Sequence, residues 1–405
     1  MTSTDPVSAL GTNGAGPGPS RAQLEYVVDL DAIAHNTGVL REHAGSAGIM
    51  AVVKADAYNH GAAAVSRAVL ASGASELGVT TIGEALALRN AGITAPILAW
   101  LHQLDADYDA AIVGDVEIGV SSPRHLARVV AAARRVGRPA AVTLKIDTGL
   151  NRNGVAPDEW EATVIAAARA SAEGAIEVRG AFTHLSHADE PGHPTIDLQK
   201  TAFDAALDGL RRAGLKPARV HMANSAATLT RPDLRYDMVR PGISVYGFSP
   251  VPQLGTFGLR PAMTVRAQVI LVKRVRAGEG VSYGHLWTAE RDTTVALIPM
   301  GYADGLPRTL SGRFEVQLGG RRRRAIGRVC MDQFVVDLGE NEDGVEEGDD
   351  AYVFGNGDHG EPSAQAWADA LDTITYEIVC GIKGRTTRSI VGGGTVAGAP
   401  GGNGR

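Results

Sequence analysis

Short apolar runs alternate with longer amphipathic stretches from about residue 23 to about residue 247. The longer stretches are rich in Ala, Leu and Arg, which favours helices, and several end at Gly, the usual stop at a helix C-terminus. The apolar runs between them are typical of buried strands. After a strand at 23–30 and a helix at 31–45, the expected strands are 48–55, 76–82, 95–101, 116–122, 140–147, 177–186, 218–225 and 236–242.

Eight strands in strict alternation with helices predict parallel pairing through right-handed crossovers. This number matches a closed (β/α)8 barrel of the TIM type. An open, doubly wound sheet is the alternative, but it more often uses fewer strands. No G-x-G-x-x-G fingerprint follows the first strand either. The predicted fold is therefore α/β, with a barrel as its main unit.

The pattern changes from about residue 258, where strands separated by Gly, Asp or Asn turns replace the alternation. This is an all-β pattern, interrupted by one helix at 363–371. The expected domains are the barrel at 23–257 and a C-terminal mainly-β domain at 258–391, with the strand at 24–30 a candidate for pairing with the β domain. The strands expected in the β domain are 262–275, 293–301, 314–320, 323–329, 333–339 and 350–355.

The chain has 405 residues and a formal net charge of −6, so no basic field points to nucleic acid or to an acidic membrane surface. The run Arg321–Arg324 follows Gly319 and Gly320 and is predicted to be a solvated turn rather than a nucleic-acid patch. Gly, Ser, Thr and Pro dominate both ends of the chain, so 1–22 and 392–405 are expected to be disordered tails.

Two cysteines, Cys330 and Cys380, do not suggest a disulfide framework and fit a reducing compartment. No apolar run reaches membrane-spanning length. The N-terminus lacks the basic and apolar regions of a secretory signal. We therefore expect a cytoplasmic protein with no metal site and with neither a nucleic-acid nor a membrane partner.

Chemically able side chains follow several of the predicted barrel strands, at the ends where such barrels place their active sites. A lone histidine after a strand is more often structural, but several converging strand ends favour a site. These residues are Lys54, the segment from Lys145 to Arg152, His184, Asn224 with Ser225, and Arg240 with Gly242.

Lys54 is the most informative of these residues. A partly desolvated lysine has a lowered pKa and forms a Schiff base with a carbonyl. A lysine whose ammonium reaches solvent is the alternative. The stretches "NSAAT" and "RPGISVYG" offer hydroxyl and backbone N–H donors, which commonly bind phosphate. A Schiff-base lysine with a phosphate site suggests pyridoxal phosphate.

Nine motifs occur in a fixed order along both predicted domains: "AVVKADAYNHG", "KIDTGLNRNG", "FTHLSHADE", "ANSAAT", "RPGISVYG", "VSYG", "PMGYADG", "GRVCMDQ" and "TITYEI". The set resembles the motifs of the alanine racemases over roughly residues 23–388. The resemblance implies interconversion of L- and D-alanine, which supplies D-alanine for cell-wall peptidoglycan. It also implies a pyridoxal-phosphate barrel joined to a β domain, in a homodimer whose chains pair head to tail and share their active sites.

The resemblance implies a cofactor site built largely from the barrel. Lys54 would form the Schiff base, and Arg240, beside His184, would face the pyridine nitrogen. Because an arginine cannot give up its proton, that nitrogen would stay unprotonated, and transamination would be suppressed. The other cofactor-binding positions that the resemblance implies are Tyr58, Asn224, Ser225, Gly242, Ile243 and Tyr376.

Racemisation removes a proton from one face of Cα and returns it to the other, most simply with two bases. The resemblance implies Lys54 and Tyr283, the latter from the partner chain; an ordinary strand aromatic is the alternative for Tyr283. Arg152 and the backbone N–H of Met331 would bind the substrate carboxylate. The residues that line the substrate corridor by the same resemblance are Tyr302, Asp332 and Tyr376.

Lys145 matches a position where some members of the family carry a carbamylated lysine beside the arginine. An unmodified lysine paired with Asp147 or Asp332 is the alternative. Two other positions depart from the family, because Asn59 and Asn151 stand where glycine is common. Asparagine tolerates positive φ better than other non-glycine residues, so the turn at Asn59 can survive. Asn151 stands next to Arg152 and can alter how that arginine is held.

Three other functions fit parts of the pattern. A basic amino-acid decarboxylase pairs the ring nitrogen with an acidic residue, whereas this chain has Arg240 there. A serine or broad-specificity racemase needs a more open corridor, and the bulky Tyr302 and Tyr376 argue for a small side chain. A non-catalytic pyridoxal-phosphate carrier resembles the barrel alone and lacks the β domain with Tyr283.

Overall fold

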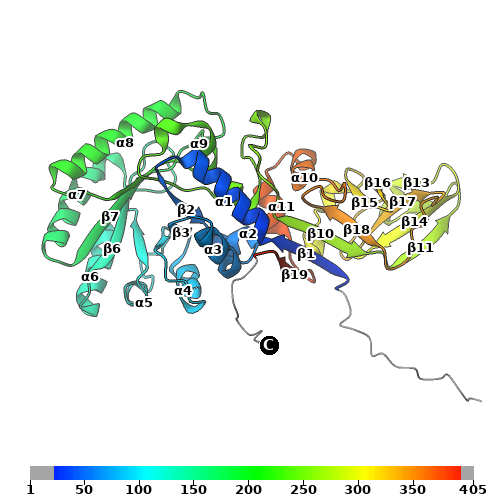
Figure 1. The fold of residues 1–405 in the computed structure, drawn as a ribbon, viewed down its shortest axis with the longest axis horizontal. Helices are drawn as coiled ribbons and strands as arrows, with labels where there is room; N and C mark the ends of the chain where they lie inside the picture. Colours follow the sequence, from blue (N-terminus) through cyan, green and yellow to red (C-terminus); the bar gives the residue numbers. More distant parts are fainter. Residues whose placement is uncertain (1–21, 394–405) are drawn as a thin grey trace, which may run out of the picture.

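In the computed structural model, which describes residues 22–393, parallel strands close into a barrel (Figure 1). The last strand pairs with the first, Gly48 opposite Met238 and Ile49 opposite Val239. The predicted (β/α)8 barrel is confirmed. Apart from residues 22, 392 and 393, the predicted tails lie outside the described residues. The barrel strands are β2 (Gly48–Val52), β3 (Glu76–Val79), β4 (Ile97–Ala99), β5 (Glu117–Val120), β6 (Ala140–Lys145), β7 (Ile176–Phe182), β8 (Arg219–His221) and β9 (Met238–Val239).

The helices around the barrel begin and end where the sequence supplies caps. Thr81 and Glu84 form a capping box at the start of α4. Ser122 caps α6, which ends before Gly137 in the left-handed region. The elements are α1 (Leu30–Ala44), α2 (Lys54–Asn59), α3 (Ala62–Ala71), α4 (Ile82–Asn90), α5 (Tyr108–Val113), α6 (Pro123–Val136), α7 (Pro157–Ala172), α8 (Thr195–Arg212) and α9 (Ser225–Thr230).

The β domain is a nine-stranded sheet of order β11-β14-β17-β16-β15-β18-β10-β1-β19. The expected strand at 262–275 is split, because Val269 bonds to Asp349 while Ile270 bonds to Leu297 on a different neighbour. The sheet strands are β1 (Leu24–Asp29), β10 (Met263–Gln268), β11 (Leu271–Val275), β14 (Thr293–Ile298), β15 (Glu315–Leu318), β16 (Arg321–Ile326), β17 (Phe334–Gly339), β18 (Asp350–Phe354) and β19 (Thr387–Val391). The domain also contains the pair β12 (Gly280–Val281) and β13 (Trp287–Thr288) and the helices α10 (Ala364–Leu371) and α11 (Thr375–Gly381).

Two features join the β domain to the barrel. The first is β1, which lies between β10 and β19 in the sheet and leads directly into α1 of the barrel. The second is α11, which lies beside α2 (Figure 1). The second feature matters for function, because α2 begins at Lys54.

The prediction of a solvated turn at Arg321–Arg324 is wrong. The turn is Gly319-Gly320, both at positive φ, and the arginines form β16. Arg323 is buried, where its guanidinium donates to the carbonyls of Leu318 and Leu338, at 3.0 Å each, and pairs with Asp343. A buried charge with this many partners is satisfied, so this arginine fixes the hairpin rather than a ligand.

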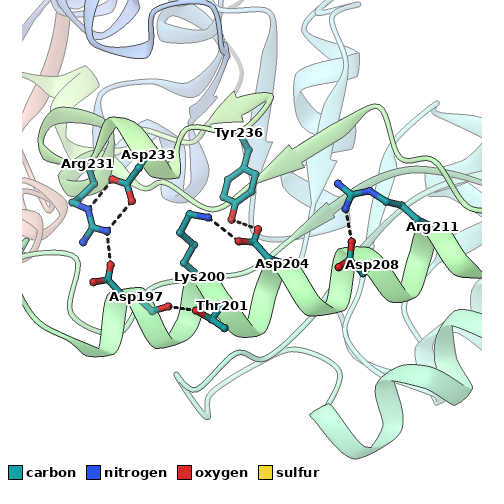
Figure 2. A network of polar contacts seen from close by, with 9 residues as sticks. All are labelled: Asp197, Lys200, Thr201, Asp204, Asp208, Arg211, Arg231, Asp233 and Tyr236. Atoms are coloured by element: carbon teal, nitrogen blue, oxygen red, sulfur yellow. Dashed lines mark hydrogen bonds and ion pairs between the residues drawn. The ribbon is translucent and has the colours of Figure 1, made fainter.

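Polar contacts fix α8 against the segment between β8 and β9 (Figure 2). Arg231 lies 2.6 Å from Asp197, and Tyr236 donates to Asp204 at 2.7 Å. Exposed pairs of this kind contribute little individually. Together they orient the chain entering β9, directly before Arg240.

Candidate active site

The predicted barrel residues converge at the carboxyl-end mouth of the barrel. They come from the ends of five strands (β2, β6, β7, β8 and β9) or from the segments that follow them, so residues far apart in sequence face one space. The pocket is lined by Val52, Lys54, Tyr58, Trp100, Lys145, Arg152, Phe182, His184, Asn224, Ser225, Arg240, Gly242, Ile243 and Tyr376. It therefore collects all eleven site residues that the barrel motifs and "TITYEI" predicted.

Lys54 begins a left-handed turn rather than ending a strand. Ala55 to Tyr58 have φ between 52° and 55°, and Asn59 has φ 68°. Left-handed helical geometry costs roughly 1–2 kcal/mol per non-glycine residue, so surrounding contacts must stabilise it. Glu84 accepts from the Ala55 N–H at 2.7 Å.

His60 stabilises the other end of this turn. Its Nδ1 lies 3.1 Å from the Ala57 carbonyl and 2.9 Å from the Tyr58 carbonyl, so this nitrogen carries the proton and donates. Burial lowers the pKa of His60 to about 4, and the imidazole is neutral. The turn directs Lys54 and Tyr58 into the same pocket.

Burial lowers the pKa of Lys54, and the charge of Arg152 lowers it further. Both effects disfavour the ammonium and favour the neutral amine. The Lys54 amine is therefore suited to attack a carbonyl carbon or to accept a proton.

One end of the pocket is rich in neutral hydrogen-bond donors. Ser225 accepts from the Gly242 N–H at 2.8 Å, which leaves the Ser225 hydroxyl proton free to point elsewhere. A Cβ at Gly242 would lie 2.4 Å from the Tyr58 hydroxyl oxygen, so only glycine permits this approach. Burial raises the pKa of both Tyr58 and Tyr376, whose rings lie 5.9 Å apart. Asn224 caps α9, which Ser225 begins.

Arg240 is buried and also lines the pocket. It donates to the Thr183 carbonyl at 2.8 Å and lies 3.0 Å from Nδ1 of His221 and 3.3 Å from Nδ1 of His184. Burial and the charge of Arg240 hold the pKa of each histidine well below its usual range. Both imidazoles are thus neutral and accept from the guanidinium through Nδ1. Burial lowers the pKa of Arg240 to about 9, which leaves it charged at neutral pH.

Lys145 lies at the end of β6, with Nζ 5.3 Å from the centre of the Phe182 ring. Burial lowers its pKa to about 8, helped by the charges of Arg240 and Arg152. The predicted alternative, an ion pair with Asp147 or Asp332, is absent from the described residues. Asp147 accepts from the backbone instead, and Asp332 pairs with Arg385 at 3.1 Å.

Apart from Tyr376, the residues predicted from the β domain do not line this pocket. Tyr283 is 71% exposed, Met331 53% and Tyr302 40%. Tyr283 faces a separate hollow beside Cys330 and Phe334. The Tyr302 and Met331 segments lie together, because the Tyr302 N–H donates to the Cys330 carbonyl at 3.1 Å. Within one chain, the two groups of predicted residues therefore occupy different surfaces.

Several residues that support the site were not predicted from the sequence. His221 holds Arg240, and Glu84 holds the Lys54 turn. Asp304 is fully buried and pairs at 2.6 Å with Arg385, which bridges to Asp332. Asp304 stands in the motif "PMGYADG" and His221 just before "ANSAAT", so proximity to a motif was the available signal.

The described residues contain no group of three or more His, Cys, Asp or Glu side chains arranged to hold a metal ion. Among residues 22–393, no helix is both long and apolar enough to cross a bilayer. Cys330 and Cys380 are free thiols.

Comparisons with known proteins show which family the chain resembles. Residues 28–250 match the family model "Alanine racemase, N-terminal domain", and residues 262–390 match "Alanine racemase, C-terminal domain". The chain is 58% identical over 368 residues to an alanine racemase of Mycolicibacterium vanbaalenii, covering 90% of this chain and 94% of the relative. It is 54% identical to that of Mycolicibacterium smegmatis, covering 97% and 99%. The crystal structure of alanine racemase from D-cycloserine producing Streptomyces lavendulae is similar, with TM-score 0.90, 49% identity and coverage of 92% and 98%.

Proposed function

The chain belongs to the alanine racemase family, and from this membership and the pocket we propose how it interconverts L- and D-alanine. The observation that carries the proposal is the juxtaposition of a lysine of lowered pKa with a cluster of neutral donors at one barrel mouth. A nucleophilic amine and a phosphate site are what pyridoxal phosphate requires of a protein.

We propose pyridoxal phosphate as the cofactor, because the residues present fit it. The Lys54 amine would bond to its aldehyde carbon. Tyr58, Tyr376, Ser225 and the space beside Gly242 would accommodate its phosphate, for which neutral hydroxyl and N–H donors are suited. When bound, the cofactor withdraws electrons from the substrate Cα and so acidifies its proton.

Arg240 is proposed to face the ring nitrogen with an N–H donor. A guanidinium that stays charged offers no transferable proton. The neutral His184 and His221 accept from it and fix its plane. This arrangement favours return of a proton to Cα over side reactions that need a protonated ring.

Two bases on opposite faces of Cα are proposed to be Lys54 and Tyr283, with Tyr283 supplied by a partner chain. Its exposure and its absence from the pocket of its own chain support this assignment, because a base must reach Cα. The same reasoning applies to Met331, whose backbone N–H would join Arg152 in binding the substrate carboxylate. We therefore propose a homodimer with shared active sites.

Tyr302, Asp332 and Tyr376 are proposed to narrow the substrate corridor. The ion pairs of Arg385 with Asp304 and Asp332 would hold the Tyr302 and Met331 segments rigid at its wall. A narrow corridor admits the methyl group of alanine more readily than longer side chains.

We propose that the product D-alanine enters cell-wall peptidoglycan and that the reaction takes place in the cytoplasm. The two free thiols fit a reducing compartment.

The test is racemisation of alanine, serine, lysine and arginine by the purified protein, followed by chiral chromatography. Alanine should react with the highest kcat/KM. Borohydride treatment followed by peptide mapping should place the cofactor on Lys54. A label on another lysine, or a preference for a larger amino acid, would contradict the proposal.

A further inference from the structure

Asn59 ends the left-handed turn that begins at Lys54 and has a φ of 68°. Glycine would adopt the φ of 68° without steric cost. The asparagine side chain, however, makes contacts that glycine cannot make. Its Nδ2 donates to the Ile382 carbonyl at 2.7 Å and lies 3.4 Å from the Val379 carbonyl, and its Oδ1 accepts from the Tyr26 hydroxyl at 3.3 Å.

The two carbonyls belong to the C-terminal end of α11. The last carbonyls of a helix lack partners within the helix and must be satisfied by other groups. Asn59 supplies that donor from a turn more than three hundred residues earlier in the chain. The first turn of the same helix carries Tyr376.

Asn59 therefore connects two residues of the donor-rich end of the pocket. Tyr58 is its immediate neighbour on the turn, and Tyr376 lies on the helix whose end it binds. The Tyr58 and Tyr376 rings lie 5.9 Å apart. A second contact holds the same turn against the β domain, because Asp56 pairs with Arg388 of β19.

We propose that Asn59 is a positioning residue that fixes Tyr58 relative to Tyr376 and thereby sets how tightly the phosphate of the cofactor is bound. The inference rests on the proposed function, since it assumes that these two tyrosines bind phosphate. Its chemistry is specific: the amide N–H, not the positive φ, carries the effect.

The experiment compares Asn59→Gly and Asn59→Asp with the parent protein. The cofactor is removed from each, and each is titrated with pyridoxal phosphate and with pyridoxal, which lacks the phosphate, by visible absorbance. Asn59→Gly should bind pyridoxal phosphate about tenfold more weakly, the effect of losing one or two neutral hydrogen bonds. Its affinity for pyridoxal should stay within about twofold of the parent's.

Asn59→Asp keeps the size and the acceptor for Tyr26 but turns a carboxylate toward the Ile382 carbonyl, so it should lose more affinity than Asn59→Gly. Hydrogen exchange should accelerate in α11 in both variants. Asp115→Gly is the control: Asp115 is exposed, also at positive φ, and remote in sequence from the site, and its replacement should change none of these quantities.

Three results would overturn the role of Asn59. Asn59→Gly could bind pyridoxal phosphate as tightly as the parent. It could lose affinity for both ligands equally, which would mean general disorder of the Lys54 turn. Asn59→Asp could bind as tightly as the parent, which would exclude the donor. If the parent itself bound neither ligand, the proposed function would fail instead, and the assignment of Asn59 with it.

Discussion

Lys145 should react with carbon dioxide in the folded protein. It is buried, has no ion pair among the described residues, and feels the positive charges of Arg240 and Arg152. A carbamate would replace this cation with an anion beside Arg152, as the amine adds to carbon dioxide and releases one proton. The repulsion between the Lys145 ammonium and the Arg152 guanidinium would become an attraction between a carbamate and that guanidinium.

The size of the effect follows from the pKa of Lys145. At about pH 7.5 a lysine with a pKa of about 8 is about one quarter neutral, whereas one at 10.5 is about one part in a thousand neutral. The reactive amine is therefore roughly two hundred times more abundant at this position. Because the folded pKa is depressed, the unmodified lysine would also make stability rise as the pH increases from about 8 to about 10.5.

The assay is ¹³C NMR of the protein in ¹³C-labelled bicarbonate. A carbamate signal should appear, vanish on acidification, and be lost in Lys145→Ala. The matched control Lys273→Ala, which removes an exposed lysine, should retain the signal.

Activity gives a second measurement. Lys145→Ala should lower kcat/KM about tenfold or more, consistent with about 1.5–3 kcal/mol for a hydrogen bond to a charged group. Lys145→Glu, which restores a carboxylate, should lose less. A signal that is independent of Lys145, or equal losses in the Ala and Glu variants, would refute the reasoning.

Three further outcomes are expected. Arg219→Met leaves the buried carboxylates of Glu76 and Glu117 without their cation and should cost about 3–5 kcal/mol in urea unfolding. Burial raises the folded pKa of Glu76 to about 7 from 4.5, so its stabilising contribution is complete below about pH 4.5 and is lost as the pH rises through about 7. The variant should therefore lose less free energy of unfolding at about pH 5.5 than at about pH 8. Equal losses at the two pH values would contradict this. Mixing Lys54→Ala with Tyr283→Phe chains should restore up to about a quarter of the parent activity, because about half of random dimers are mixed and each holds one intact site; no recovery, with mixed dimers shown to form, would count against shared sites. In deuterated water, Tyr283→Ala should exchange the α-proton of D-alanine faster than it racemises and leave that of L-alanine nearly unexchanged, whereas equal exchange of both would mean that one base serves both faces.

The local pattern of the chain was enough to predict the barrel. Most of its strands are buried on both faces, so they appear as largely apolar runs, as in β2 (Gly48–Val52), whatever their neighbours are. The all-β pattern of the second half was equally visible. Strand ends and motifs also identified Lys54, Arg152 and Arg240, because the carboxyl ends of parallel strands must meet at one mouth.

Other features depended on partners far away in the chain. The break at Val269–Ile270 reflects a change of neighbouring strand, which the pattern of apolar residues does not record. Strand β19 is mostly exposed, so it lacks the apolar run that would predict a buried strand. Arg323 belongs to a charged run, yet it is buried because carbonyls from two other segments receive its guanidinium.

The left-handed turn at Lys54 shows the same dependence most clearly. Local preference argues against consecutive non-glycine residues at positive φ. The turn exists because Glu84 receives the Ala55 N–H and because Asn59 binds the end of α11. Such hydrogen bonds join segments that only the folded chain brings together, and no sequence window contains both partners. For this reason the identity of the lysine could be predicted from sequence, whereas the conformation that aims it was decided by tertiary structure.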